Sequence, residues 1–377
     1  MYSLMTKSVI LSVTNDLTSE QRVHKVCVFL EKLGFDVTLV GRKRKKSLPL
    51  ENRSYKTKRM FLLFEKGPLF YAEYNFRLFF YLLFHKADVL VANDLDTLLA
   101  NYLAAQFKRC EIVHDSHEYF TGVPELAGRN FVKSVWKKIE RGIFPKLKYV
   151  YTVNNSIVKL YKDEYRIEIK VVRNFPLLAE NENRALKSKS ELQLPEDKKI
   201  ILYQGSVNID RGLMEAVEAM QYVNDAILLI VGDGDILKEM KAKAQKLNPD
   251  EKIIFRKKVP FEELKQYTAL ADIGISLDMD TNINYKFSLP NKIFDFVHAG
   301  VPVLASNLVE IQKIFSQYEI GTMIENHNPK HIAEKINFML NDLKKIKTWK
   351  ENCLLASKEF CWQNEEKVLD EIYSQFL

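Results

Sequence analysis

The polar residues most suggestive of chemistry lie at a predicted helix start in the segment SLPNKIFDFVHAGVPVLAS, residues 288–306. Pro290 suits the first position of a helix, because its missing N–H leaves no hydrogen bond unmade there. The free amides of the first turn carry a partial positive charge, and Lys292 adds a full one. Asp295 follows one turn later and can accept hydrogen bonds from hydroxyl groups. The segment therefore predicts an anion site beside a carboxylate that binds hydroxyls, such as those of a ribose.

Two other predicted strand ends in this half of the chain carry glycine. Gly205 and Ser206 follow the apolar run IILYQ, and Gly232 lies in VGDGD. Arg211 stands before a glycine at the start of another predicted helix, where its guanidinium can hold a phosphate. The spacing matches neither GxGxxG nor the Walker A pattern, so a nicotinamide dehydrogenase or P-loop NTPase is not supported. We expect a phosphate-bearing ligand at these strand ends.

Polar side chains also follow strand-like runs in the first half. Asp94 comes after VLVAN, and His114, His117 and Glu118 lie in HDSHEY. A zinc site would need further ligands at a defined spacing, and the sequence supplies none. These side chains either bind a hydroxyl-rich ligand or cap helices and form local hydrogen bonds, and the sequence leaves both interpretations open.

The elements that must position these residues alternate between strand-like and helix-like stretches, which is typical of parallel sheets covered by helices. The first series predicts a doubly wound α/β domain over residues 1–176, and the second predicts another over 198–356. The polar, aperiodic segment 177–197 is typical of a linker. Residues 357–377 predict a terminal amphipathic helix. Ligands of such sheets bind beyond the carboxyl ends of the strands, so we expect the two domains to face each other across a cleft.

Length and composition agree with two ordinary globular domains. The chain has 377 residues, of which 47% are hydrophobic and 28% charged, and two cores of common size fit that length. The four cysteines are scattered without a CxxC pair, which favours neither a disulfide framework nor a cysteine zinc site. The first apolar run is too short for a signal peptide. We expect a reducing, cytoplasmic environment.

The net charge of +7 is concentrated in one segment. Residues 42–59 hold nine Lys or Arg and one Glu, and ten of the next 24 residues, 61–84, are aromatic. A basic run followed by an aromatic, amphipathic segment suits an anionic membrane surface. The alternative is a solvated lysine loop followed by a helix whose aromatic residues face the core. Charged residues interrupt segment 61–84, so it is not expected to span a membrane, and nucleic acid is not an expected partner.

Taken together, these motifs resemble the GT-B glycosyltransferases of the large retaining family 4, of the bacterial surface-polysaccharide type. The resemblance is carried by the segments DLDTLLA, HDSHEYF, VVRNFP, VGDG, ADIGISL and AGVPVLAS, and covers nearly the whole chain. It implies two Rossmann-like domains and transfer of a sugar from a nucleotide diphosphate sugar to an acceptor hydroxyl, with retention and without metal or cofactor. It also implies that the second domain binds the donor, that the first binds the acceptor, and that the terminal helix crosses back onto the first.

The resemblance also implies residue roles. Arg211 and Lys292 are expected to stabilise the leaving diphosphate, and His114 to lie near the donor sugar, with His117 as its competitor. The nucleotide sugar would contact Gly205, Ser206, Gly232, Ser288, Leu289, Pro290, Asn291 and Asp295. The acceptor or sugar side would include Asp94, His117 and Glu118. The first acid of the family motif is replaced by Phe287, and Asp278, Asp280 and Asn284 are the candidates to replace it.

The expected partners are a UDP- or GDP-linked sugar and a sugar or lipid-linked sugar acceptor. An anionic membrane surface would be contacted through residues 42–84, with the protein peripheral at the inner face of the membrane. Two other functions are compatible with the sequence. One is a nucleotide-sugar epimerase of the same fold, and the other is a non-catalytic binder in which Phe287 marks a decayed site.

Overall fold

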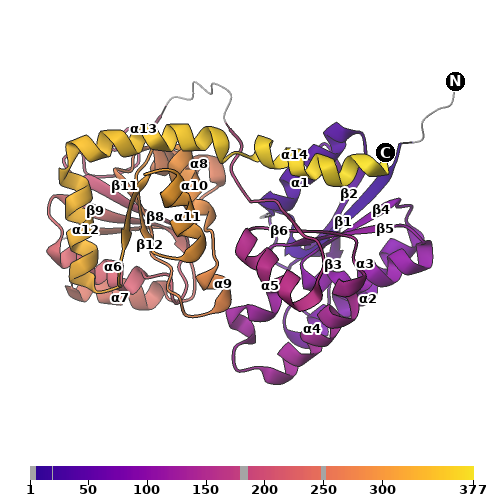
Figure 1. The fold of residues 1–377 in the computed structure, drawn as a ribbon. Coiled ribbons are helices and arrows are strands. Elements are labelled where there is room, and N and C mark those ends of the chain that lie inside the picture. The colour runs from indigo at the N-terminus through magenta and orange to yellow at the C-terminus, as the bar shows by residue number, and fades with distance from the viewer. Residues whose placement is uncertain (1–5, 19, 179–185, 248–251) are drawn as a thin grey trace. The chain divides into compact units, whose positions relative to one another are not determined.

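The computed structural model describes residues 6–18, 20–178, 186–247 and 252–377. The chain divides into two compact units, shown in Figure 1. The N-terminal unit comprises residues up to Asn174 together with Glu365–Leu377, and the C-terminal unit comprises Phe175–Asn364. Each unit contains one parallel sheet with helices packed around it.

The N-terminal unit is built on a seven-stranded sheet in the order β3-β2-β1-β4-β5-β6-β7. Every strand pair is parallel, and the order reverses between β1 and β4, as in a doubly wound fold. The strands are β1 Ser8–Asp16, β2 Asp36–Lys43, β3 Lys56–Phe61, β4 Val89–Asn93, β5 Glu111–Ser116, β6 Tyr149–Thr152 and β7 Lys170–Val171. The α-helices are α1 Gln21–Leu33, α2 Gly67–Phe84, α3 Leu95–Lys108, α4 Asn130–Ile143 and α5 Asn155–Tyr165.

The C-terminal unit has a six-stranded parallel sheet in the order β10-β9-β8-β11-β12-β13, with its switch point between β8 and β11. Its strands are β8 Lys199–Ser206, β9 Ala226–Asp233, β10 Ile253–Arg256, β11 Ile273–Ser276, β12 Val303–Ser306 and β13 Gly321–Ile324. Its α-helices are α6 Leu213–Ala219, α7 Leu237–Leu247, α8 Phe261–Ala269, α9 Ile283–Lys286, α10 Asn291–His298, α11 Val309–Gln317, α12 Pro329–Asn341 and α13 Leu343–Glu359.

Helices cover both faces of the C-terminal sheet, because side chains alternate between two separate cores. Ile201 and Tyr203 of β8 pack into one core with α6, α7 and α12. Ile200 and Leu202 of the same strand pack into the other with α10, α11 and α13. A strand buried on both faces carries apolar side chains toward both, which is why residues 200–203 of β8 form a continuous apolar run. The predicted α/β class with two Rossmann-like domains is confirmed.

Parts of the expected linker and of the terminal helix pack within the two units. Leu192 and Leu194, within the expected linker 177–197, belong to a core of the C-terminal unit, whereas residues 179–185 of that segment lie outside the described ranges. The terminal helix α14, Trp362–Tyr373, begins in the C-terminal unit and ends in the N-terminal one. Its Tyr373 hydroxyl lies 3.3 Å from that of Tyr151 on β6. None of the described helices combines the length and apolar character that crossing a membrane requires.

Candidate functional site

In the C-terminal unit, the polar residues predicted from the sequence gather at the carboxyl ends of β8 and β11. Gly205 lies at the end of β8, and Gly232 on β9 is its register partner. A Cβ at Gly232 would lie 1.9 Å from the Gly205 carbonyl oxygen, so the close approach of the two backbones requires glycine at position 232. A Cβ at Gly205 would lie 3.9 Å from Lys292 Cε. The helix start at Lys292 therefore lies beside the strand end at Gly205.

Asp278, two residues after β11, organises two cations at this edge. Its Oδ1 accepts a hydrogen bond from Arg211 Nη1 at 2.7 Å, and its Oδ2 lies 3.9 Å from Lys292 Nζ. Asp278 is fully buried. Burial raises the pKa of its carboxyl, but the charges of Lys292 and Arg211 outweigh this, and the pKa is lowered overall. The result is a cluster of two cations and one carboxylate with a net positive charge.

The two cations of this cluster are held by aromatic rings as well as by Asp278. Lys292 Nζ lies 4.3 Å from the centre of the Tyr203 ring, and the Arg211 guanidinium lies 4.6 Å from that of Tyr285. Burial lowers the pKa of Lys292 to about 8, with a further decrease from Arg211 that Asp278 opposes. An ammonium whose charge is penalised by burial is stabilised when an anion arrives. The cluster is thus arranged to receive negative charge.

The start of α10 adds polar groups to the same place. Ser288 donates its amide to the carbonyl of Tyr285, the residue whose ring faces the Arg211 guanidinium. Within the described part of the chain, Ser288 Oγ and Arg211 Nε are buried atoms without a hydrogen-bond partner. Such atoms are costly unless a ligand or water satisfies them. Oxygen atoms of a diphosphate fit the guanidinium donor and the hydroxyl.

Asp295, one turn into α10, is oriented by a second polar chain. Gln204 Nε2 donates to Asp295 Oδ2 at 2.9 Å, and Gln204 Oε1 accepts from Thr268 Oγ1 at 2.8 Å. Gln204 directly precedes Gly205, so the carboxylate is tied to the end of β8. This places a hydrogen-bond acceptor near the cation cluster, as the sequence predicted for a ribose-binding acid.

The remaining predicted residues of this unit occupy the surroundings of the cluster. Ser206 is exposed, and its carbonyl accepts from the Tyr203 hydroxyl at 2.6 Å. Asn291 is exposed at the first helical position, while Leu289 is partly buried against the core. Pro290 is the N-cap of α10 and not its first helical residue, one position earlier than expected. It has extended backbone, with ψ 130°, because the chain enters the helix from a loop.

In the N-terminal unit, His117 is held between two carboxylates at the ends of β4 and β5. Its Nδ1 lies 3.2 Å from Asp94 Oδ2, and its Nε2 lies 3.1 Å from Asp115 Oδ2. Burial lowers the pKa of His117, but the two aspartates outweigh it and raise the pKa to about 9. The imidazole is therefore protonated at neutral pH, and each of its ring N–H groups faces a carboxylate.

A buried arginine fixes the second of these carboxylates. Arg22 of α1 donates from Nε and Nη2 to the two oxygens of Asp115 at 3.0 and 2.8 Å, and from Nη1 to the Val172 carbonyl. Burial raises the pKa of Asp115, yet Arg22 and His117 outweigh it and hold the pKa well below its usual range. Asp94 also accepts from the His117 amide at 2.8 Å and has a positive φ of 59°. Such strained backbone is typical of functional strand ends.

The structure does not bring His114 to this strand end. The side chain is 1% exposed, its Nδ1 lies 3.0 Å from the Ala92 carbonyl oxygen, and its ring contacts Phe144 in the core. Burial lowers its pKa to about 4. His117 is therefore the histidine available to a ligand, and Glu118 is half-buried beside it.

The sequence does not assign the roles that Arg22, Asp115 and Asp278 have in these two clusters. For Asp278 it offers only the replacement of the acid missing at Phe287. The signal that marks it is its place directly after the run ADIGISL, at a strand end. Arg22 gives no such signal, because a buried arginine on a helix cannot be distinguished from a solvated one without the fold.

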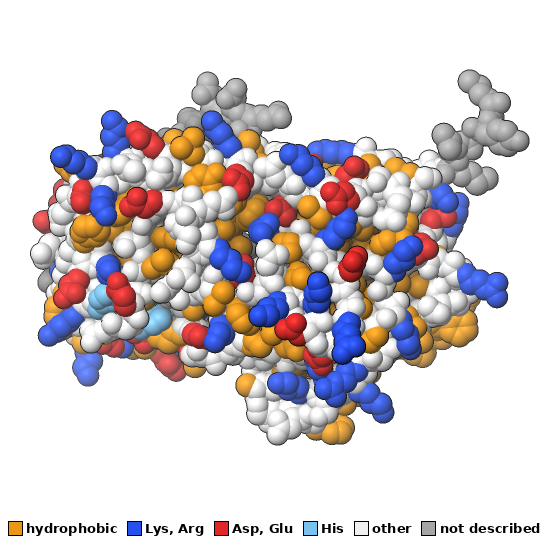
Figure 2. Space-filling view, in the orientation of Figure 1, with side chains coloured by type: hydrophobic (Ala, Val, Ile, Leu, Met, Phe, Trp, Pro, Cys, Tyr) orange, Lys and Arg blue, Asp and Glu red, His pale blue; other side chains and the backbone are white. Residues whose placement is uncertain are grey.

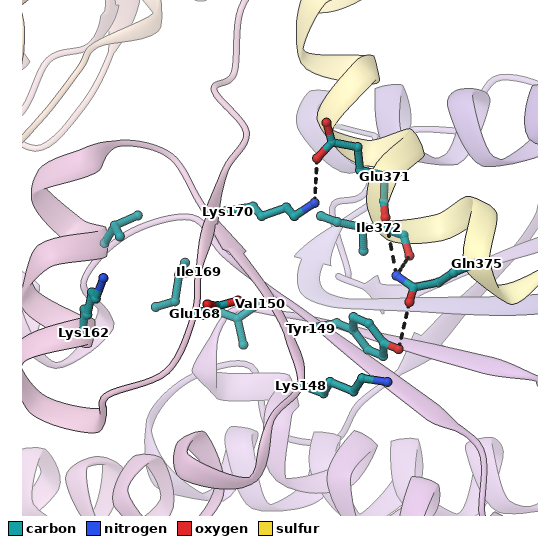
Figure 3. A pocket seen from close by; sticks show the side chains of 11 residues that line it. Lys148, Tyr149, Val150, Lys162, Glu168, Ile169, Lys170, Glu371, Ile372 and Gln375 are labelled. Carbon is teal, nitrogen blue, oxygen red and sulfur yellow. Dashed lines mark hydrogen bonds and ion pairs between the residues drawn. The ribbon is translucent and has the colours of Figure 1, made fainter.

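A pocket of about 470 Å³ lies elsewhere in the N-terminal unit, between β6, α5, β7 and α14 (Figure 3). Tyr149 and Lys170, the first residues of β6 and β7, line it. Lys170 pairs with Glu371 at 2.6 Å, and Tyr149 donates to Gln375 at 3.0 Å. The pocket is therefore at the amino ends of the strands, opposite the edge where ligands of such sheets bind. Among the described residues there is no group of three or more His, Cys, Asp or Glu that could hold a metal ion.

Comparison with known proteins agrees with this architecture. The family model for Glycosyltransferase Family 4 matches residues 19–175, and the model for Glycosyl transferases group 1 matches residues 185–354. A D-inositol 3-phosphate glycosyltransferase of Xylanimonas cellulosilytica is 21% identical over 199 residues. That match covers 50% of this chain and 45% of the relative, so the chain spans less than half of the relative's length.

Two solved structures share the fold over almost their whole length. The sucrose-phosphate synthase of Thermosynechococcus elongatus superposes with a TM-score of 0.79 at 17% identity, covering 98% of each chain. HepE of Anabaena, in complex with UDP and glucose, gives 0.72 at 14% identity and covers 98% of this chain and 100% of its own. The two family models together leave only short segments of the chain unmatched. The chain therefore belongs to the GT-B glycosyltransferases, with a family 4 N-terminal part and a group 1 C-terminal part.

Proposed function

We propose that this chain transfers a sugar from a nucleotide diphosphate sugar to an acceptor hydroxyl, with the donor bound by the C-terminal unit. The observation that carries the proposal is the cluster of the buried Asp278 with the half-buried Arg211 and Lys292, at the ends of β8 and β11. Its net positive charge, together with the unpartnered Ser288 Oγ and Arg211 Nε, fits a diphosphate. Asp295 then takes a ribose hydroxyl. HepE, which has the same fold, was solved with UDP, and this supports a UDP- or GDP-linked donor.

In the proposed mechanism, the protein acts mainly on the leaving group. Negative charge grows on the diphosphate as the glycosidic bond breaks, and preorganised cations at that position lower the barrier. Arg211 is fixed by Asp278 and Tyr285, so little reorganisation is needed when the charge develops. We propose that the configuration is retained, that a phosphate oxygen of the donor takes the acceptor proton, and that neither metal nor cofactor takes part.

The N-terminal unit is proposed to bind the acceptor through the strand end at His117. The imidazolium faces Asp94 and Asp115 with its two ring nitrogens and positions both carboxylates, and Asp94 and Glu118 supply acceptors for hydroxyl groups. The acceptor class is a sugar or a lipid-linked sugar, in the synthesis of a polysaccharide or glycolipid. We propose a cytoplasmic protein, peripheral at the inner face of a membrane and contacting it through residues within 42–84.

Donor turnover tests the proposal. The full chain is screened with UDP-, GDP- and ADP-linked sugars for a rise in melting temperature, and the hits are assayed for release of free nucleotide diphosphate. Arg211→Ala should lower turnover by about 10²-fold. Lys265→Ala should leave it unchanged, because Lys265 is an exposed lysine that pairs with Glu262 and lies over the ring of Phe261.

Two other outcomes would identify a different function, and a third would contradict the role of the cluster. A melting shift without any release of nucleotide diphosphate supports a non-catalytic binder. Interconversion of the donor sugar without release supports an epimerase. A normal rate in Arg211→Ala contradicts the assigned role of the cluster.

A further inference from the structure

Helix α2 is apolar on two opposite faces, and only one of them is buried. Phe70, Tyr74, Leu78 and Leu82 follow one another at a spacing of four and pack into the core. Phe76, Phe80 and Phe84 follow the same spacing two positions later and are 66%, 39% and 77% exposed. Two residues correspond to about 200° around a helix, so the exposed phenylalanines point away from the core. The core-facing alternative predicted from the sequence thus accounts for only half of this helix.

The exposed stripe continues onto the neighbouring helix. Phe79, half-buried, lies 5.4 Å from Phe80 and 5.9 Å from Phe107 of α3, measured between ring centres. Phe107 is 71% exposed and Leu103, one turn earlier, is 40% exposed. We call this surface the aromatic face: Phe76, Phe79, Phe80, Phe84, Leu103 and Phe107. Large side chains that contact one another on two helices form a continuous patch, and such a patch marks an interaction surface.

Basic residues lie at the far end of the aromatic face. Lys108 at the end of α3 donates from Nζ to the carbonyls of Leu82 and His85, which joins the ends of α2 and α3. Lys86 and Arg109 are exposed next to this junction. The nearby carboxylate of Asp88 already accepts from the amide and hydroxyl of Ser8, both at 2.8 Å. The end of the patch beyond Phe84 and Phe107 is therefore cationic.

The basic run of the sequence lies at the other end of α2, next to the residues that precede the helix. The Lys45 amide donates to Glu65 Oε1 at 3.2 Å, two residues before α2. Residues 43–46 of this run are exposed. Arg42, by contrast, is buried, with its guanidinium 4.5 Å from the centre of the Phe70 ring, so it serves the fold. Figure 2 shows blue basic and orange hydrophobic side chains beside one another on the visible surface.

We propose that the aromatic face and its two basic ends dock the protein on an anionic lipid bilayer. Exposed phenylalanines gain free energy by entering the boundary between headgroups and acyl chains. Lys and Arg at both ends attract lipid phosphates at the same time, and each contributes most within a Debye length of the surface. The one acidic side chain of the helix, Glu73, is neutralised by Arg77 at 2.8 Å and by the amides of Leu63 and Phe64. Charge complementarity therefore favours an anionic surface, and the docking does not depend on the proposed reaction.

Vesicle binding by the full chain tests this inference. Binding is measured by co-sedimentation with vesicles of phosphatidylcholine alone and with vesicles containing about a third phosphatidylglycerol. Wild type should bind the anionic vesicles and be released by salt. The variant Phe76→Ser/Phe80→Ser/Phe84→Ser should lose about 10-fold or more in partition coefficient. A matched control removes three exposed leucines of α13, at 75%, 54% and 55% exposure, through Leu343→Ser/Leu354→Ser/Leu355→Ser, and should bind like wild type.

A second variant separates the electrostatic part. Lys43→Gln/Arg44→Gln/Lys45→Gln/Lys46→Gln should weaken binding to anionic vesicles and flatten its salt dependence. All these positions are exposed, so melting temperatures should stay close to wild type. If the triple phenylalanine variant does not fold, Phe84→Trp supplies the test. When anionic vesicles are added, the fluorescence emission of the introduced tryptophan should shift to the blue and be quenched by brominated lipid. The tryptophan of Leu343→Trp should show neither change.

Three results would overturn the inference. Wild type could fail to bind anionic vesicles, or the phenylalanine variant could bind as wild type does. The third is a dimer in solution that the phenylalanine substitutions convert to a monomer, without any vesicle binding. That result would identify a second copy of the chain as the occupant of the aromatic face.

Discussion

Binding of UDP to the C-terminal unit should weaken as the pH rises above about 8, because Lys292 loses its proton there. Burial lowers the pKa of this ammonium to about 8. The groups around it do not titrate in the same range: the pKa of Asp278 is lowered, and the pKa values of Arg211 and Tyr203 are raised. Of Lys292 and these three neighbours, only the Lys292 ammonium therefore changes its charge near pH 8.

The size of the effect follows from the fraction of protonated lysine. Above the pKa, each further pH unit lowers that fraction about tenfold, so the Kd should rise by up to about tenfold per pH unit. The Kd stops rising once the deprotonated lysine no longer contributes to UDP binding. A hydrogen bond to a charged group is worth about 1.5–3 kcal/mol, which corresponds to a limit of roughly 10- to 10²-fold in Kd. Bound UDP stabilises the ammonium, so its pKa is higher in the complex and a proton is taken up on binding.

Isothermal titration calorimetry of UDP binding between pH 6.5 and 9.5 provides the measurement. Repeating it in buffers of different ionisation enthalpy counts the protons taken up. Lys292→Arg keeps the charge at every pH in this range, because a guanidinium does not lose its proton there. Its affinity should therefore vary much less with pH. Lys292→Met should bind weakly and equally at all pH values, and Lys265→Met serves as the surface control with the wild-type profile.

One result would refute the reasoning. If Lys292→Arg shows the same fall in affinity above pH 8 as wild type, another group, or the uracil base itself, is responsible. Proton uptake that persists in Lys292→Met would lead to the same conclusion.

Two further predictions concern stability. Because the pKa of His117 is raised to about 9, its ion pairs stabilise the fold fully below about pH 6.5, and this is lost as the pH rises through 9. Urea unfolding should show that His117→Gln removes up to roughly 3 kcal/mol of this pH-dependent stability, and an unchanged profile would contradict the ion pairs. Gly212→Ala should lower the melting temperature much more than Gly300→Ala. Both glycines have φ near 65°, but a Cβ at Gly212 meets the Leu277 carbonyl oxygen at 2.2 Å and one at Gly300 makes ordinary contacts; equal losses would show that strain alone matters.

The sequence shows both the charge and the strand-end position of several predicted site residues, and the fold brings these residues together. Gly205, Arg211 and Lys292 are far apart in the chain, yet the carboxyl ends of parallel strands gather at one edge of a sheet. The choice between His114 and His117 could not be made in this way. Strand β5 is buried at four successive positions, 113–116, so its sequence does not alternate and gives no sign of which side each residue faces. Packing against Phe144 decided the place of His114.

The aromatic face shows a related limit. The aromatic residues of 61–84 suggested two alternatives, a core face or a lipid surface, and the helix has one face buried in the core and one exposed aromatic face. The sequence could not show this, because a helix that is apolar all round has no preferred direction. The direction is set by tertiary packing, since Tyr74 donates its hydroxyl to the Val13 carbonyl of β1 and thereby turns Phe76 and Phe80 outward.

The structure reduces the number of residues that could replace the acid missing at Phe287. Asp278 was one candidate to replace it, but both of its oxygens are already engaged. Oδ1 accepts from Arg211, and Oδ2 accepts from Ser276 Oγ at 3.2 Å while facing Lys292. If Asp278 turned toward a sugar, it would leave two half-buried cations without their counter-charge, and the loss of one partner of a buried pair costs several kcal/mol. We therefore propose that Asp278 serves the diphosphate side and that other groups hold the donor's ring hydroxyls. Asp280, exposed in the same loop and 3.8 Å from Lys286, is one such group, because it can change partners at little cost.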